Sequence, residues 1–108
     1  MTLASKDKVV GVLLAGGQAR RMGGMNKCLL PLLGKSLLSH VLERARPQVG
    51  PIILNANGNP KEYSDFDLPV VGDVISGFAG PLAGILTALE WAAANATNCK
   101  FVASFPCD

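Results

Sequence analysis

The sequence lacks the features that would place the chain in a membrane or outside the cell. No apolar run reaches the roughly 18 residues needed to cross a bilayer, and the start, MTLASKDK, has no apolar core resembling a signal peptide. The three cysteines are odd in number and show no paired spacing, which argues against a disulfide framework and against a zinc site. We therefore expect a cytoplasmic globular protein that makes no contact with a membrane.

A strong excess of charge of either sign is also missing. Ten Lys and Arg residues face eight Asp and Glu residues, which gives a net charge of +2. This is far from the strongly basic surface that nucleic-acid binding normally requires. The length of 108 residues and the hydrophobic content of 49% suit one domain with a single core. A small anionic ligand fits this composition better than a nucleic acid does.

Acidic residues are absent from one segment in particular, LAGGQARRMGGMNK, which covers Leu14 to Lys27. The segment holds four glycines, two adjacent arginines and a lysine. Backbone N–H groups in a glycine-rich turn form a concavity that binds anions, and Arg21 and Lys27 can add charge-assisted hydrogen bonds to phosphate oxygens. We interpret it as a phosphate-binding loop rather than a flexible surface loop. The chain has no P-loop, because the GKS sequence at Gly34 would need a glycine five residues earlier, where Leu29 stands. The G-x-G-x-x-G fingerprint does not match either, because the glycines after the first strand are adjacent.

Apolar periodicity predicts strands that alternate with helices. The expected strands cover residues 8–15, 51–56, 68–73 and 100–105, and the expected helices cover residues 35–45 and 80–96, with a short helix near 59–66. Alternation of this kind produces right-handed crossovers and a parallel sheet that is covered on both faces. The predicted fold class is therefore α/β, a three-layer α/β/α, Rossmann-like and mostly parallel sheet.

Polar residues follow the expected strands at their carboxyl ends. Asn55 and Asn57 come after the second strand, Asp73 after the third and Asp108 after the fourth. The carboxyl ends of parallel strands meet at one edge of a sheet, where α/β proteins bind their ligands. Each acid alone could be a turn residue or a helix cap, but a pair of carboxylates beside phosphates is typical of a Mg²⁺ site. The sequence thus predicts one crevice that holds a phosphate-bearing ligand and Mg²⁺.

Four motifs together resemble one known family. The glycine-rich loop LAGG…RMG…K, followed by NAN, GPLAG and PCD, has the order and approximate spacing seen in molybdenum cofactor guanylyltransferases, the molybdopterin-guanine dinucleotide biosynthesis protein A family. The match spans nearly the whole chain. It implies a sheet of the nucleotide-diphospho-sugar transferase type. Because family members are nearly twice as long, it also implies that residues 1–108 are the nucleotide-binding portion of one nucleotidyltransferase domain, truncated after the fourth strand.

The resemblance implies a reaction and its partners. Family members transfer GMP from GTP to the terminal phosphate of molybdopterin, release pyrophosphate and require Mg²⁺. Transient contacts with other proteins of molybdenum cofactor biosynthesis, or with acceptor proteins, are implied as well. Two alternatives stay open. One is cytidylyl transfer to molybdopterin, although relatives of that kind typically have L-A-A-G in the loop. The other is a nucleotide-sensing module without catalytic activity.

The resemblance also implies roles for individual residues. Lysine, arginine and Mg²⁺ would stabilise the charge that builds on the pyrophosphate leaving group, so no covalent enzyme nucleophile is required. The implied GTP-binding residues are Leu14, Ala15, Gly16, Gly17, Lys27, Asn55, Asp73 and Asp108; the implied catalytic residues are Arg21, Lys27 and Asp108; and the implied metal ligand is Asp108.

Overall fold

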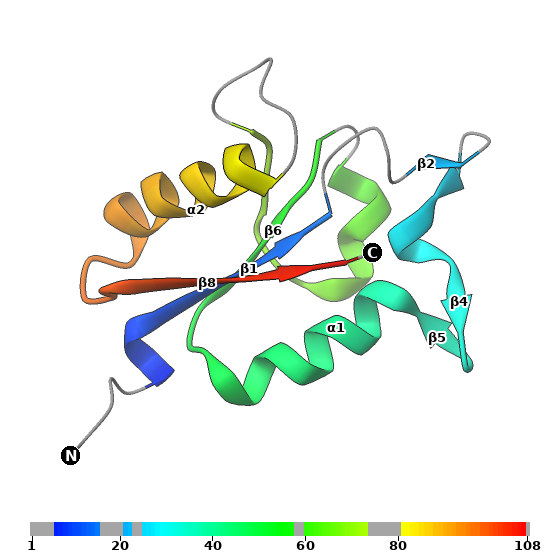
Figure 1. Cartoon of the computed structure of the whole chain (residues 1–108), viewed down its shortest axis with the longest axis horizontal. Helices are drawn as coiled ribbons and strands as arrows, with labels where there is room; N and C mark the ends of the chain where they lie inside the picture. The colour runs from blue at the N-terminus through cyan, green and yellow to red at the C-terminus, as the bar shows by residue number, and fades with distance from the viewer. Residues whose placement is uncertain (1–5, 16–20, 23–24, 58–59, 74–80, 108) are drawn as a thin grey trace.

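The computed structural model describes residues 6–15, 21–22, 25–57, 60–73 and 81–107, which form strands and helices in alternation (Figure 1). With η denoting a 3-10 helix, the elements in chain order are η1 (Lys6–Lys8), β1 (Val9–Leu14), β2 (Arg21–Met22), β3 (Met25–Asn26), η3 (Lys27–Leu29), β4 (Pro31–Leu32), β5 (Lys35–Ser36), α1 (Leu37–Ala45), η4 (Arg46–Gln48), β6 (Ile52–Asn55), η5 (Pro60–Phe66), β7 (Val70–Val71), α2 (Pro81–Asn95) and β8 (Phe101–Pro106). Among these described elements, no helix is both long and apolar enough to cross a membrane.

The main sheet of the described residues has the strand order β7-β6-β1-β8, and every neighbouring pair is parallel. The first long strand of the chain, β1, therefore lies between β6 and β8. Its last residue, Leu14, is in register with Asn55 on one side and with Pro106 on the other. The chain moves outward from β1 to β6 and β7, and then returns to the other side of β1 with β8. This reversal of strand order lies between β1 and β8, where α/β sheets have their ligand crevice.

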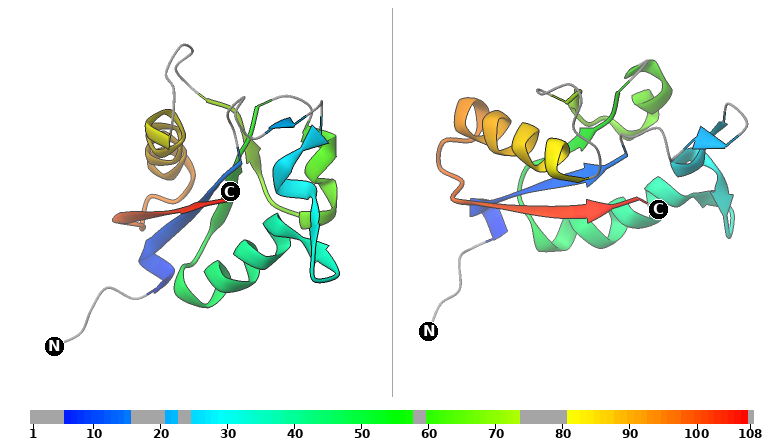
Figure 2. Two further views of the ribbon diagram at one scale, coloured as in Figure 1. Left: turned by 45° about the vertical axis from the view of Figure 1, so that its right-hand side comes forward. Right: turned by 45° about the horizontal axis from the view of Figure 1, so that its top comes forward.

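Helices cover both faces of the sheet, as the two views of Figure 2 show. Leu13 of β1 belongs to the core cluster that includes Leu38 and Leu42 of α1, whereas Val12 of β1 packs in a second cluster with Ala88 of α2. Successive residues of one strand thus face opposite helices, which explains why the β1 segment is apolar without interruption. The predicted three-layer α/β/α fold is confirmed.

Helix α1 begins one residue after a serine cap. The side-chain oxygen of Ser36 accepts a hydrogen bond from the backbone N–H of Ser39 at 3.1 Å, which satisfies an otherwise free donor of the first turn. The buried residues Leu38, Leu42 and Ala45 then recur on one face. The helix expected from residue 35 therefore starts two residues later than predicted.

A small hairpin occupies that position instead. Strands β4 and β5 pair in antiparallel fashion, with Leu32 opposite Lys35, so that Leu33 and Gly34 form a two-residue turn. Their φ angles are +53° and +88°. This left-handed backbone suits Gly34 but is unfavourable for Leu33, whose side chain is 89% exposed. The sequence signals the turn only at Gly34, because hairpins with positive φ at both positions usually carry Asn, Asp or Gly at the first position, where this chain has Leu33.

Two side chains of α1 contact the hairpin. Glu43 forms an ion pair with Lys35 of β5, and the Lys35 ammonium that donates to it lowers the pKa of the Glu43 carboxyl below its usual range. The ring Nε2 of His40 lies 2.5 Å from the carbonyl oxygen of Leu32. His40 therefore has a structural partner on the hairpin.

The remaining elements agree with the expected ones apart from their ends. The third expected strand, over residues 68–73, is reduced to the two residues of β7, although the carbonyl of Pro69 already accepts from Leu54 N at 2.9 Å. The expected short helix is the 3-10 helix η5, and the last strand runs one residue further than expected, to Pro106.

Replacing Leu33 with Asn should stabilise the protein. Asn tolerates a positive φ far better than Leu does, and nearly all of the Leu33 side chain faces solvent, so little burial is lost. We expect a gain of about 1 kcal/mol in the free energy of unfolding, measured by urea denaturation. Leu33→Val is the matched control and should destabilise, because a β-branched side chain is worse still at this φ. A loss of stability in Leu33→Asn would show that Leu33 makes a contact that the fold depends on.

Candidate nucleotide site

Backbone hydrogen bonds gather the ends of the strands at one edge of the sheet. The N–H of Ala15 donates to the carbonyl of Asn55 at 2.9 Å, and the N–H of Cys107 donates to the carbonyl of Leu14 at 3.3 Å. On the far side of β6, Ala56 N donates to Val71 O at 3.2 Å. These bonds continue the parallel pairing past the strands themselves. They bring the starts of the glycine-rich loop, the NAN motif and the PCD motif next to one another.

The glycine-rich loop leaves this edge directly after β1. Leu14 and Ala15 are 4% and 5% exposed, so the chain is still buried where the loop begins. Gly16 and Gly17 lie outside the described residues. Further along, Arg21 pairs with Asn26 in the two-stranded ribbon β2–β3, and Lys27 opens the 3-10 helix η3. The structure describes the backbone of Arg21 and Lys27, and their side-chain contacts stay predictions.

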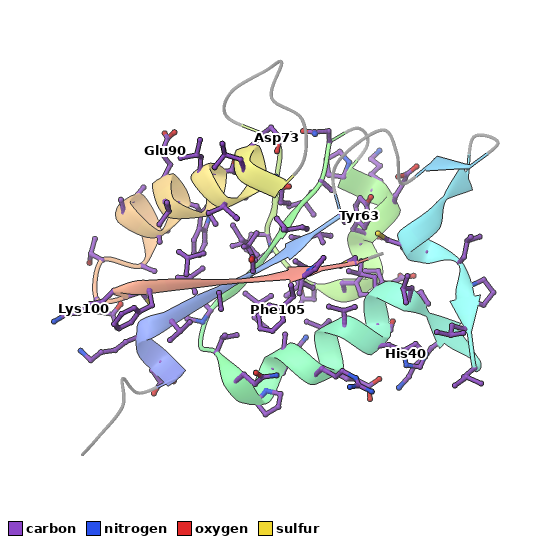
Figure 3. All side chains as sticks on the ribbon, viewed as in Figure 1. His40, Tyr63, Asp73, Glu90, Lys100 and Phe105 are labelled. Atoms are coloured by element: carbon purple, nitrogen blue, oxygen red, sulfur yellow. The ribbon has the colours of Figure 1, made fainter. Side chains whose placement is uncertain are left out.

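Asp73 is held by two asparagines of the NAN motif. The Nδ2 of Asn55 donates to Asp73 Oδ1 at 2.9 Å, and the Nδ2 of Asn57 donates to Asp73 Oδ2 at 2.9 Å. Asn57 Oδ1 in turn accepts the backbone N–H of Asp73 at 2.9 Å. Asp73, labelled in Figure 3, lies two residues beyond the end of β7. We call Asn55, Asn57 and Asp73 the carboxamide bracket.

The sequence predicts Asn55 and Asp73 correctly as neighbours but indicates no separate role for Asn57. The side chain of Asn55 is buried, and its amide group bonds to other residues of the protein. It is 3% exposed, and its amide donates to Val71 O at 3.2 Å as well as to Asp73, so both amide hydrogens already have protein acceptors. Its side chain therefore ties the ends of β6 and β7 together.

Helix α2 approaches Asn55 very closely through Gly84, the last residue of the GPLAG motif. A Cβ atom built on Gly84 would lie 2.6 Å from Asn55 Oδ1 and 2.6 Å from Leu14 Cδ2, closer than such atoms are found. Only glycine lets the helix backbone come this near to the strand ends. GPLAG thus positions the first turns of α2 against the edge where β1 and β6 end.

A cysteine connects η3 to the end of β8. The thiol of Cys28 donates to the carbonyl oxygen of Cys107 at 3.1 Å, and both side chains are fully buried. Cys28 directly follows Lys27, and Cys107 directly precedes Asp108, which lies outside the described residues. Cysteine number and spacing argue only against a disulfide framework and a zinc site, and no sequence signal reveals that these two residues meet.

The described residues do not form a metal site by themselves. They contain no group of three or more His, Cys, Asp or Glu side chains that could hold a metal ion. Asp73 is the acid that the described structure places at the carboxyl edge, and one lone pair of each of its carboxylate oxygens is used by the bracket.

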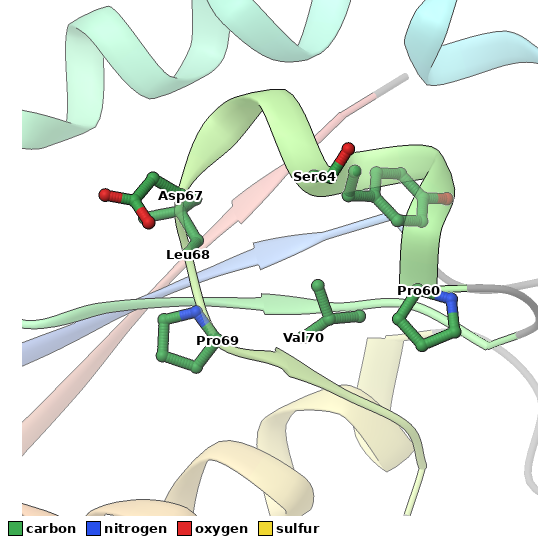
Figure 4. Close-up of a pocket in the computed structure, with 7 residues that line it drawn as sticks. Pro60, Ser64, Asp67, Leu68, Pro69 and Val70 are labelled. Carbon is green, nitrogen blue, oxygen red and sulfur yellow. The ribbon is translucent and has the colours of Figure 1, made fainter.

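A cavity on another part of the molecule is a poor nucleotide site. It has a volume of about 550 Å³ and lies between η5 and β7 (Figure 4). Its lining residues are Pro60, Tyr63, Ser64, Asp67, Leu68, Pro69 and Val70. The one charged side chain in this lining is an acid, which would repel a triphosphate. The strand ends are therefore the better candidate.

A parallel sheet whose reversal point is flanked by a glycine-rich loop defines the class as a nucleotide-binding α/β domain. Residues 11–108 match the family described as the MobA-like NTP transferase domain, and the chain belongs to this family. The resemblance seen in the sequence is thereby confirmed.

Comparison with curated and solved proteins gives the same family. The chain is similar to proteins named molybdenum cofactor guanylyltransferase, with 56% identity over 87% of the chain and 45% of the relative from Mesorhizobium japonicum, and 44% identity over the whole chain and 51% of the relative from Rhodopseudomonas palustris. The crystal structure of Rv0371c from Mycobacterium tuberculosis matches with a TM-score of 0.71 and 25% identity, covering 96% of this chain and 53% of that one. The chain spans about half the length of the curated relatives that it matches.

The close approach at Gly84 can be tested by Gly84→Ala. Helix propensity alone predicts that this change stabilises the protein by about 1 kcal/mol. We expect the opposite, a loss of about 1–3 kcal/mol in the free energy of unfolding, because the new Cβ must displace Asn55 or Leu14. Thermal or urea denaturation decides the sign. A stabilised Gly84→Ala protein would contradict the packing described for α2.

Proposed function

We propose that the protein to which this chain belongs transfers GMP from GTP to molybdopterin and releases pyrophosphate. The observation that carries the proposal is the meeting of the glycine-rich loop, the carboxamide bracket and the end of β8 at one edge of the sheet. The names of the relatives from Mesorhizobium japonicum and Rhodopseudomonas palustris supply the substrate class.

In this proposal the loop binds the nucleotide. The backbone of Leu14, Ala15, Gly16 and Gly17 holds GTP, and the side chains of Arg21 and Lys27 contact its phosphates. A phosphate oxygen of molybdopterin attacks the α-phosphorus, and the bond to the pyrophosphate breaks as the new bond forms. The cationic side chains stabilise the charge that develops on the leaving group.

The carboxamide bracket supplies the other end of the site. Because both amide hydrogens of Asn55 bond to the protein, we propose that Asn55 contributes to GTP binding mainly by fixing Asp73. The Asp73 carboxylate is unsuited to phosphate, since like charges repel. It suits an N–H or O–H donor of the nucleoside instead.

The oxygen ligands expected at this edge of the sheet suit a divalent metal. Mg²⁺ is usually held by one or two carboxylates together with substrate phosphates and water. We propose Asp108 as the carboxylate that holds Mg²⁺, because it directly follows Cys107, whose N–H bonds to Leu14 at the start of the loop. When bound, the ion would neutralise phosphate charge.

Two other functions can be separated from this one. Calorimetric titration with GTP and CTP distinguishes guanylyl from cytidylyl transfer, and we expect GTP to bind more tightly. Pyrophosphate release from the full-length protein with GTP and molybdopterin distinguishes an enzyme from a nucleotide sensor. A cytoplasmic location and transient contacts with other molybdenum cofactor proteins remain predictions.

Lys27→Ala should weaken GTP binding and slow the transfer far more than Lys35→Ala. The loss of one charged donor to a phosphate costs on the order of 1.5 to 3 kcal/mol. Lys35 is a matched control because its ammonium already pairs with Glu43 on the surface, where the pair contributes little. Equal GTP affinities of the two variants would remove Lys27 from the site.

Asp108→Ala should abolish the dependence of GTP binding on Mg²⁺ in the full-length protein. The physical reason is the loss of the carboxylate that would hold the ion. Asp65→Ala, an exposed acid of η5, serves as the control and should keep the dependence. The measurement is a GTP titration with and without Mg²⁺. If the Asp108→Ala protein still bound GTP more tightly with Mg²⁺, Asp108 would not be the ligand.

A further inference from the structure

We infer that Asn57 is a positioning residue for the nucleotide site, which acts by orienting the carboxylate of Asp73. The inference rests on the proposed function, in which Asp73 contacts the nucleoside of GTP. It assigns to the exposed second asparagine of NAN a role separate from that of the buried first one.

The backbone of the NAN segment aims both asparagines at the same carboxylate. Successive residues of an extended chain point to opposite faces, so residues two apart share a face. Leu54 and Ala56 are buried in the core cluster on the α1 face. Asn55 and Asn57 therefore both lie on the opposite face of this segment, where Asp73 accepts from each of them.

Two hydrogen bonds join the side-chain amide of Asn57 to Asp73. Asn57 Nδ2 donates to Asp73 Oδ2, and Asn57 Oδ1 accepts from Asp73 N, each at 2.9 Å. One amide thus fixes both the backbone and the side chain of the same residue. Hydrogen bonds to an ionised acceptor are stronger than neutral ones, so this pair restricts the rotation of the carboxylate.

The arrangement leaves Asp73 able to accept from a ligand. Each carboxylate oxygen has two lone pairs, and the bracket uses one on each. The side chain of Asp73 is half-buried, so its other lone pairs can meet a ligand at the edge of the sheet. Asn57 itself is exposed and contributes little to the core, which makes its effect on folding small.

A double-mutant cycle on the full-length protein tests the inference. GTP dissociation constants are measured by calorimetry for the wild type, Asn57→Ala, Asp73→Ala and the double variant, and melting temperatures verify that each protein is folded. We expect Asn57→Ala to weaken GTP binding about tenfold, which corresponds to about 1.4 kcal/mol. In the Asp73→Ala background the same change should have no further effect, because its target is gone. Asn95→Ala, an exposed asparagine at the end of α2, is the control and should leave the affinity unchanged.

The outcomes separate this inference from the proposed function. If Asp73→Ala weakens binding but Asn57→Ala does not, or if Asn57→Ala weakens it equally in both backgrounds, the positioning role is wrong while the nucleotide site stands. If Asp73→Ala leaves GTP affinity unchanged, the proposed role of Asp73 fails, and the inference fails with it. Should Asn57→Ala not fold, Asn57→Ser takes its place in the cycle with the same expectations.

Discussion

The parallel pairing of β1 with a strand on each side is the constraint on which the rest of the structure depends. Because β6 and β8 run in the same direction as β1, the carboxyl ends of all three strands lie at one edge of the sheet. The bonds from Ala15 to Asn55 and from Cys107 to Leu14 extend this pairing beyond the strands. Segments that are far apart in the sequence are thereby held next to one another, and the proposed nucleotide site is built from the loops that these strands lead into.

Several residues in and beside the motifs support this edge of the sheet. Because Gly84 has no side chain, helix α2 can pack directly against Asn55. The side chain of Asn55 connects β6 to β7, and the thiol of Cys28 connects η3 to the end of β8. A motif that marks a nucleotide site in a sequence thus contains residues of two kinds. In the proposed site some of them bind the nucleotide, and others hold the backbone in position.

Much of the fold could be predicted because its signals are local. The uninterrupted apolar run of β1 follows from burial on both faces, and the spacing of Leu38, Leu42 and Ala45 follows from one packed helix face. The hairpin before α1 was missed because Leu33 adopts a positive φ that leucine normally avoids.

The candidate site could be predicted only in part. The strand ends, with Asn55 and Asp73 beside them, follow from the sequence, since the carboxyl ends of parallel strands meet at one edge, whereas Asp108 lies outside the described residues. The partners of Asp73 depend on the register of β6 against β7, and the bond of Cys28 joins residues 79 apart in the chain. Neither leaves a periodic pattern in the sequence. The structure therefore adds the contacts that hold this edge of the sheet together.

The central claim is that the nucleotide binds at the carboxyl ends of these strands, and amide chemical-shift mapping by NMR tests it most directly. On addition of GTP to the full-length protein, we expect the largest changes at Ala15, Asp73 and Cys107, whose amides lie at this edge. Ser64 and Asp67, which line the cavity between η5 and β7, should change little. The opposite pattern, with the changes centred on Ser64 and Asp67, would contradict the account.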